Sequence, residues 1–129
     1  MKKNKFLYLV ILFVSLGILF SCAIDESYKN KVIQDNFDSL NTLNFYYKSM
    51  MESVNSLHKR NQLSSSDIQE IENSGNAFYS AYMDAVDSLE RYKKNLESED
   101  MVSKNIKKAN SKYISLEKLV NNRAYKLEE

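Results

Sequence analysis

The sequence contains no proline and no tryptophan, and it has only two glycines and one cysteine in 129 residues. One of the glycines, Gly17, lies in an apolar N-terminal run, so Gly75 is the only glycine in the rest of the chain. All-β folds place glycine and proline at their many turns, and such turn signals are missing here. A single cysteine excludes an intramolecular disulfide. The composition therefore predicts an all-α fold stabilised by packed helices alone.

The N-terminus has an arrangement that is typical of export. Three lysines among the first five residues precede an apolar run over residues 6–20, and Ser21 and Cys22 follow. A basic head, an apolar stretch and a small residue before the cleavage point form the layout of a secretory signal peptide, here residues 1–21. An uncleaved transmembrane helix is a competing interpretation, but it needs about 20 apolar residues and this run is shorter. A plain secreted protein would keep Cys22 as an unpaired thiol, which exported proteins usually avoid.

The last signal residues and the cysteine, Leu19-Phe20-Ser21-Cys22, resemble the lipobox of bacterial lipoproteins. The resemblance covers only the signal region. It implies that a dedicated signal peptidase cuts between Ser21 and Cys22, and that the Cys22 thiol receives a diacylglyceryl group while the new amino group is acylated, for example with palmitate. Two or three acyl chains hold a protein stably on a membrane, whereas one gives marginal binding. The expected location is the exported face of a bacterial cell membrane or outer membrane, with residues 22–30 as a lipidated tether.

Beyond the signal, apolar residues recur at helical spacing in three stretches, at about residues 31–60, 66–96 and 100–127. The second stretch is the most regular, because its apolar residues alternate steps of three and four without a break. They are Ile68, Ile71, Gly75, Phe78, Tyr82, Ala85, Leu89, Tyr92 and Leu96. The third stretch repeats this heptad seam from Val102 to Leu127, and the first has a less regular stripe from Ile33 through Phe37 to Leu57. Short polar connections require antiparallel neighbours, so residues 31–129 are predicted to form one elongated antiparallel three-helix bundle with coiled-coil-like packing.

The helix ends carry local signals as well. Ser66, with Gln69 three residues later, is expected to form a capping box at the start of the second helix. A tight turn at residues 97–99 is expected to separate the second and third helices, with Ser98 or Asp100 capping the third.

Gly75 lies in the middle of the second predicted helix, where glycine costs about 1 kcal/mol relative to alanine. The apolar seam keeps its phase on both sides of this residue. We therefore expect close packing there, with a large side chain of the first helix, Tyr47 or Met50, filling the space beside it.

Signals for catalysis, metal ions or cofactors are weak. His58 is the only histidine, and no carboxylate lies at helical spacing to orient it. Asp84 and Asp87 form a carboxylate pair without a histidine that would complete a metal motif. Phosphate-binding glycine loops are missing, and a net charge of +1 gives no reason to expect a nucleic-acid partner. We therefore expect neither an enzyme nor a cofactor.

Two candidate surfaces remain. Tyr46 and Tyr79 lie just off the apolar seams, and exposed aromatic side chains are favoured in binding surfaces, so with His58 at the distal turn they are candidates for contact with a partner. Packing within the bundle is the competing interpretation for both tyrosines. A basic cluster at the end nearest Cys22 is a candidate membrane-facing surface, although its cations could simply pair with Glu97, Glu99 and Asp100. The cluster consists of Arg91, Lys93, Lys94, Lys104, Lys107 and Lys108.

The predicted function is that of a small membrane-anchored envelope lipoprotein acting as a protein-binding or structural module. Its partners would be membrane lipid, through acylated Cys22, and an envelope or extracellular protein. The alternatives are a lipoprotein that excludes phage or neutralises a toxin, and a small-ligand or catalytic domain, which needs a cavity that three tightly packed helices rarely leave. Helices with apolar seams and off-seam tyrosines could also pair with a second copy of the chain.

Overall fold

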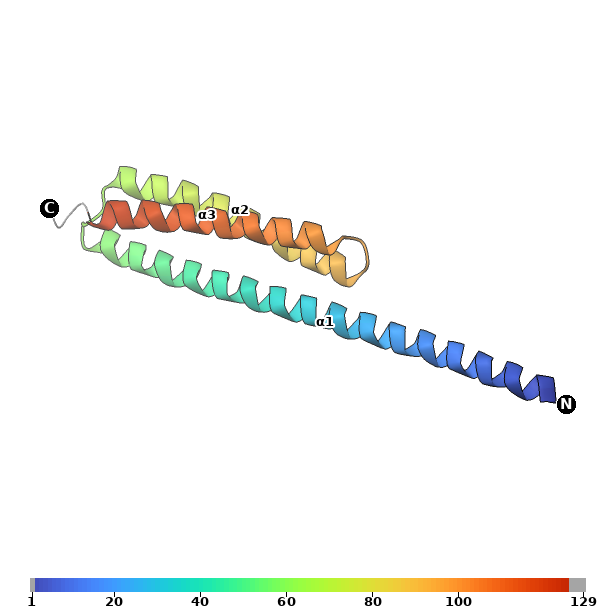
Figure 1. Cartoon of the computed structure of the whole chain (residues 1–129). Helices are drawn as coiled ribbons and strands as arrows, with labels where there is room; N and C mark the ends of the chain where they lie inside the picture. The colour runs from blue at the N-terminus through green and yellow to red at the C-terminus, as the bar shows by residue number, and fades with distance from the viewer. Residues whose placement is uncertain (1, 126–129) are drawn as a thin grey trace. The chain divides into compact units, whose positions relative to one another are not determined.

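The computed structural model describes the backbone of residues 2–125 and the side chains of residues 10–14 and 25–125. The described backbone forms three helices, α1 (Lys2–Lys59), α2 (Ser65–Lys93) and α3 (Glu99–Tyr125), and these residues contain no strand (Figure 1). The predicted all-α fold is confirmed. The chain divides into two compact units, Met1–Gln34 and Asp35–Glu129.

The first unit is a helical segment of α1. The helix predicted to begin near residue 31 is part of α1, and the tether predicted at residues 22–30 has helical backbone. The side chains of Ser21 and Cys22, on which the predicted processing depends, lie outside the described residues. Within the described residues, no helix combines the length and the hydropathy needed to cross a bilayer.

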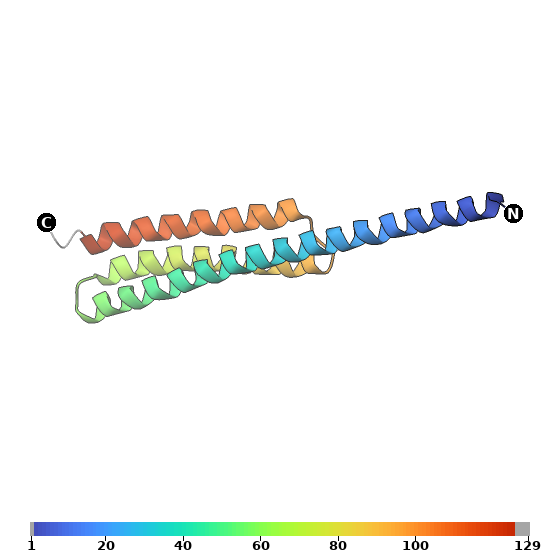
Figure 2. The ribbon, with the colours of Figure 1, turned by 60° about the horizontal axis from the view of Figure 1, so that its bottom comes forward.

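The second unit carries its own hydrophobic core, to which residues 35–59 of α1, α2 and α3 all contribute. Figures 1 and 2 both show α2 and α3 side by side and running in opposite directions, with the α1 segment beside them. Every buried apolar side chain among the described residues belongs to this unit, and Phe78, Ile71 and Leu116 are the largest that are fully buried. The hydrophobic core formed by the described residues therefore lies within the segment Asp35–Glu129.

The predicted apolar seam of α2 is confirmed at Ile71, Phe78, Ala85 and Leu89, which are all buried. For two other residues, the prediction of a place in a buried apolar seam is wrong. Leu96 follows the end of α2 and is 63% exposed, and Phe37 of α1 is 47% exposed. Leu127 lies outside the described residues.

Asparagine terminates both α1 and α2 in this glycine-poor chain. Asn61 and Asn95 have φ angles of 56° and 59°, in the left-handed region that asparagine tolerates better than most residues. After each of them, a backbone N–H donates to the carbonyl five residues earlier, from Gln62 to Leu57 at 2.9 Å and from Leu96 to Arg91 at 2.8 Å. These bonds form the Schellman motif, which satisfies carbonyls at a helix C-terminus. The tight turn predicted at residues 97–99 is therefore wrong, because the left-handed residue that ends α2 is Asn95.

The capping box of α2 begins two residues earlier than predicted, at Ser64 instead of Ser66. Ser64 has an extended backbone, its hydroxyl accepts from the Asp67 N–H at 3.0 Å, and the Asp67 carboxylate accepts from the Ser64 N–H at 3.3 Å. The box predicted at Ser66 and Gln69 is wrong because those residues already lie within the helix. At α3, the predicted Ser98 cap is confirmed by a hydrogen bond from the Met101 N–H to the Ser98 hydroxyl at 3.3 Å.

Gly75 is buried against α1, as the seam indicates. A Cβ atom added at this position would lie 3.4 Å from Tyr47 Oη and 3.9 Å from Met51 Sδ. The prediction that Tyr47 fills this space is confirmed, and its companion is Met51 rather than Met50.

Candidate functional site

An open groove of about 600 Å³ lies between α1 and α3 in the second unit. Half of its lining residues are apolar or aromatic, and each helix also contributes a charged residue. The lining residues are Asp38, Ser39, Thr42, Leu43 and Tyr46 of α1 with Ile106, Lys107, Asn110, Tyr113 and Ile114 of α3. Since Asp38 and Lys107 are both exposed, the groove carries one acidic and one basic side chain on opposite helices.

Small side chains on α1 leave this space open. The hydroxyls of Ser39 and Thr42 donate to the backbone carbonyls of Asp35 and Asp38 in the preceding turn, at 3.0 and 2.9 Å. Their hydrogen bonds are therefore satisfied within the helix, and they need no polar partner across the groove. Larger side chains at these positions would fill the space between α1 and α3.

Aromatic rings connect this groove to the core. Tyr113 makes an edge contact with buried Phe78 at a centroid distance of 5.8 Å, and it lies 6.4 Å from the ring of Tyr46. Tyr46 in turn makes an edge contact with Phe45 at 5.9 Å. Tyr46 and Phe45 are 51% and 67% exposed. One edge of the groove, at Tyr113, therefore contacts the buried core, whereas the aromatic rings at its other edge are exposed to solvent.

The Tyr113 hydroxyl is held in its neutral form. Burial raises the pKa of Tyr113 above its ordinary value, and the negative charge of Glu117 and a hydrogen bond with this carboxylate raise it further. The single O–H of Tyr113 therefore donates to the Glu117 carboxylate.

The three residues predicted to form one partner surface do not lie together. Tyr46 lines the α1–α3 groove, whereas Tyr79 packs beside Tyr47 and Tyr82 where α1 meets α2, with centroid distances of 6.4 and 6.1 Å. His58 is exposed in the last turn of α1. The groove brings Tyr46 together with residues that the sequence reasoning did not select, notably Asn110 and Ile114. In the sequence, the small polar residues Ser39 and Thr42 beside the α1 seam were the available indication of this groove.

The predicted basic cluster divides into two groups. Arg91 pairs with Glu97 at 3.4 Å and Lys93 pairs with Glu90 at 2.9 Å, so part of its charge is balanced locally at the end of α2. Lys94 also lies at this end and is exposed, and Lys104, Lys107 and Lys108 are exposed on α3.

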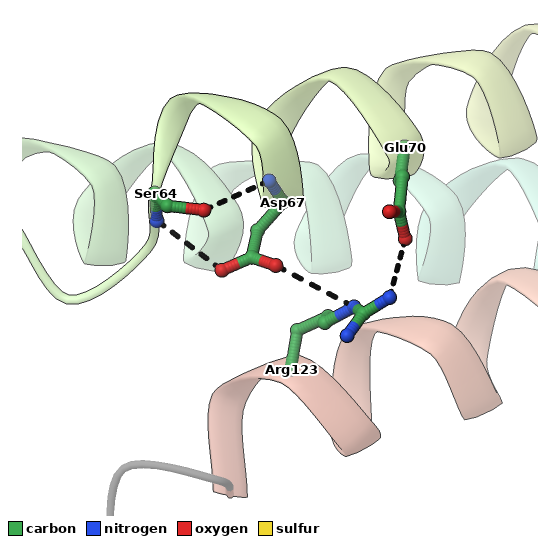
Figure 3. Close-up of polar contacts among 4 residues, drawn as sticks. All are labelled: Ser64, Asp67, Glu70 and Arg123. Atoms are coloured by element: carbon green, nitrogen blue, oxygen red, sulfur yellow. Dashed lines mark hydrogen bonds and ion pairs between the residues drawn. The ribbon is translucent and has the colours of Figure 1, made fainter.

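Arg123, near the C-terminal end of α3, joins this end of the helix to the start of α2 (Figure 3). One guanidinium nitrogen donates to Glu70 Oε2, and Nε lies 3.5 Å from Asp67 Oδ1, the same carboxylate that closes the Ser64 capping box. The hydrogen bond with Glu70 is the largest cause of a raised pKa at Arg123. A cation fits this position because two carboxylates of α2 face it, which indicates a structural role.

Within the described residues, no group of three or more histidine, cysteine, aspartate or glutamate side chains could hold a metal ion. Comparison of the chain with protein-family models, curated proteins and solved structures finds no match.

Proposed function

We propose that this chain is a lipid-anchored protein of the bacterial envelope whose helical part binds another protein. The anchor proposal rests on the order of lysines, apolar run and Leu19-Phe20-Ser21-Cys22 at the N-terminus. For the helical part, we propose an antiparallel three-helix bundle with coiled-coil-like packing, supported by the buried heptad residues Ile71, Phe78, Ala85 and Leu89 of α2.

The observation that carries the binding proposal is the apolar groove between α1 and α3. A groove between two helices can accept the apolar face of an amphipathic helix, and this is a recurrent way in which proteins bind helical segments. Exposed Tyr46 and half-exposed Ile114, 44% accessible, would contact such a helix at its margins.

The groove proposal can be tested by photo-crosslinking in cells. A photoreactive side chain at Thr42, which lines the groove, should give a discrete cross-linked species, and the same group at exposed Ser80 of α2 should not. Asn110→Arg would place a charged side chain in the groove and should abolish the species. The matched control, Ser111→Arg, changes the adjacent exposed residue outside the groove lining and should leave it intact. Equal cross-linking from Thr42 and Ser80, or none from Thr42, would contradict the proposal.

The anchor can be tested separately by mass spectrometry and cell fractionation. The mature protein should begin at Cys22 and carry the added mass of a diacylglyceryl group, with or without an N-acyl chain. Cys22→Ala should abolish both processing and membrane association, whereas Ser21→Ala keeps a small residue before the cysteine and should preserve them. Normal processing and envelope retention of Cys22→Ala would refute the anchor.

A further inference from the structure

Acidic and basic residues are segregated between α2 and α3, although the whole chain has a net charge of only +1. Helix α2 contains six acidic residues and two basic ones. After its first two residues, which are acidic, α3 contains six basic residues and a single acidic one, Glu117. The near-neutral total charge therefore hides a basic helix beside an acidic one.

Five of the cations on α3 remain available to an external partner. Arg123 is engaged with Asp67 and Glu70 of α2. The other five, called here the α3 lysine face, are exposed and make no ion pair with another described residue. They are Lys104, Lys107, Lys108, Lys112 and Lys118.

The α3 lysine face points away from the core. The buried residues of α3, Val102, Ala109, Leu116 and Val120, follow a heptad spacing along one side of the helix, and most of the lysines fall on the other side. Apart from the lysines, the exposed residues between Lys104 and Lys118 are Asn110, Ser111, Ile114, Ser115 and Glu117. A face with lysines but few apolar residues suits contact with a charged surface and not insertion into one.

We infer that the α3 lysine face docks on an anionic lipid bilayer, with α3 lying along the membrane surface and α2, with its six acidic residues, farther from it. Anionic headgroups attract each nearby lysine, and they repel the carboxylates of α2, so the segregated charges specify an orientation. This orientation differs from one in which the C-terminal end of α2 contacts the membrane. At that end, Arg91 and Lys93 already pair with Glu97 and Glu90.

The inference rests on the proposed lipid anchor, which would keep the domain close to a bilayer. At full extension, the chain from Cys22 to Asp35 spans no more than about 45 Å. A weak electrostatic contact is sufficient under these conditions, because tethering replaces a bimolecular encounter with an effectively intramolecular one.

The test uses the segment Asp35–Glu129, which carries its own core and lacks Cys22, so it reports on the lysine face independently of lipidation. Binding is measured by vesicle flotation with neutral phosphatidylcholine vesicles and with vesicles containing anionic phosphatidylglycerol, at low and at high salt. The segment should bind the anionic vesicles and release them at high salt, since ions screen exposed charges. The triple variant Lys104→Gln, Lys107→Gln, Lys108→Gln should lose affinity about fivefold per lysine, on the order of 100-fold in total.

Two further triple variants make the result decisive. Lys48→Gln, Lys59→Gln, Arg60→Gln removes the same charge from exposed positions outside α3 and should bind nearly as the unmodified segment does. Equal affinity of the unmodified segment for neutral and anionic vesicles would overturn the inference. An equal loss of affinity in the Lys104/Lys107/Lys108 variant and the Lys48/Lys59/Arg60 variant would also overturn it. A larger loss on changing Arg91, Lys93 and Lys94 to glutamine would overturn it in favour of the α2 end. Retention on polyglutamate beads without vesicle binding would overturn it in favour of an acidic protein.

Discussion

Replacing Gly75 with alanine should stabilise the second unit. Glycine in a helix interior is about 1 kcal/mol less favourable than alanine, mainly because the unfolded chain has more conformational freedom to lose. No glycine in the described chain has a positive φ, so alanine can adopt the backbone conformation found at Gly75. The perturbation is therefore a single methyl group added to a buried position.

The contacts of that methyl group determine the size of the effect. The added Cβ would lie 3.4 Å from Tyr47 Oη, 3.6 Å from Tyr47 Cε2 and 3.9 Å from Met51 Sδ, which are ordinary van der Waals distances. We therefore expect no steric penalty that would cancel the gain in helix propensity, and a net increase of about 1 kcal/mol in the free energy of unfolding. For a domain of this size, such a change raises Tm by about 4–8 °C.

Urea and thermal unfolding of Asp35–Glu129, followed by circular dichroism, would measure the change. Asn76→Ala, at the exposed neighbouring position, is the matched control because it changes helix propensity without adding a contact to α1. Gly75→Val should destabilise, since its extra methyl groups have no space beside Tyr47 and Met51. A Gly75→Ala variant less stable than the original would refute the reasoning, because it would mean that α1 approaches α2 too closely for one methyl group.

Three further changes test other parts of the fold. Ser64→Ala should lower the free energy of unfolding by about 1 kcal/mol in urea titrations, while Ser66→Ala should have little effect, and the reverse order would contradict the observed capping box. Asn95→Ala should lower the Tm because alanine is strained at positive φ, whereas Asn95→Gly should not; equal melting temperatures would argue against the left-handed turn. Because the pKa of Tyr113 is raised in the folded state, its contribution to stability is present below about pH 10 and is lost as pH rises through the raised pKa. The unfolding free energy of Tyr113→Phe should therefore fall less steeply above pH 10 than that of the original chain, and an unchanged pH dependence would refute this assignment.

The sequence by itself determined that the fold is all-α and identified most of the buried residues of α2, although it missed Ala81 and Ser88. The alternating spacing of three and four residues places Ile71, Phe78, Ala85 and Leu89 on one side of a helix, and all four are buried. The close packing at Gly75 followed from the same regularity, because only a neighbouring side chain could use the space that a glycine leaves in an uninterrupted seam. Local chemistry also identified Ser98 as a helix cap.

Only the tertiary structure decided where α2 begins and ends, and where the groove lies. Several serines near residue 64 could cap α2, and the choice of Ser64 brings Asp67 to a position where it also faces Arg123 of α3, 3.5 Å away. Leu96 continues the apolar period, yet Asn95 ends the helix before it. The groove depends on the spacing between α1 and α3, which no residue of either helix specifies alone. Periodicity reports which side of a helix is buried, whereas separation and register between helices arise from how two sets of side chains fit together.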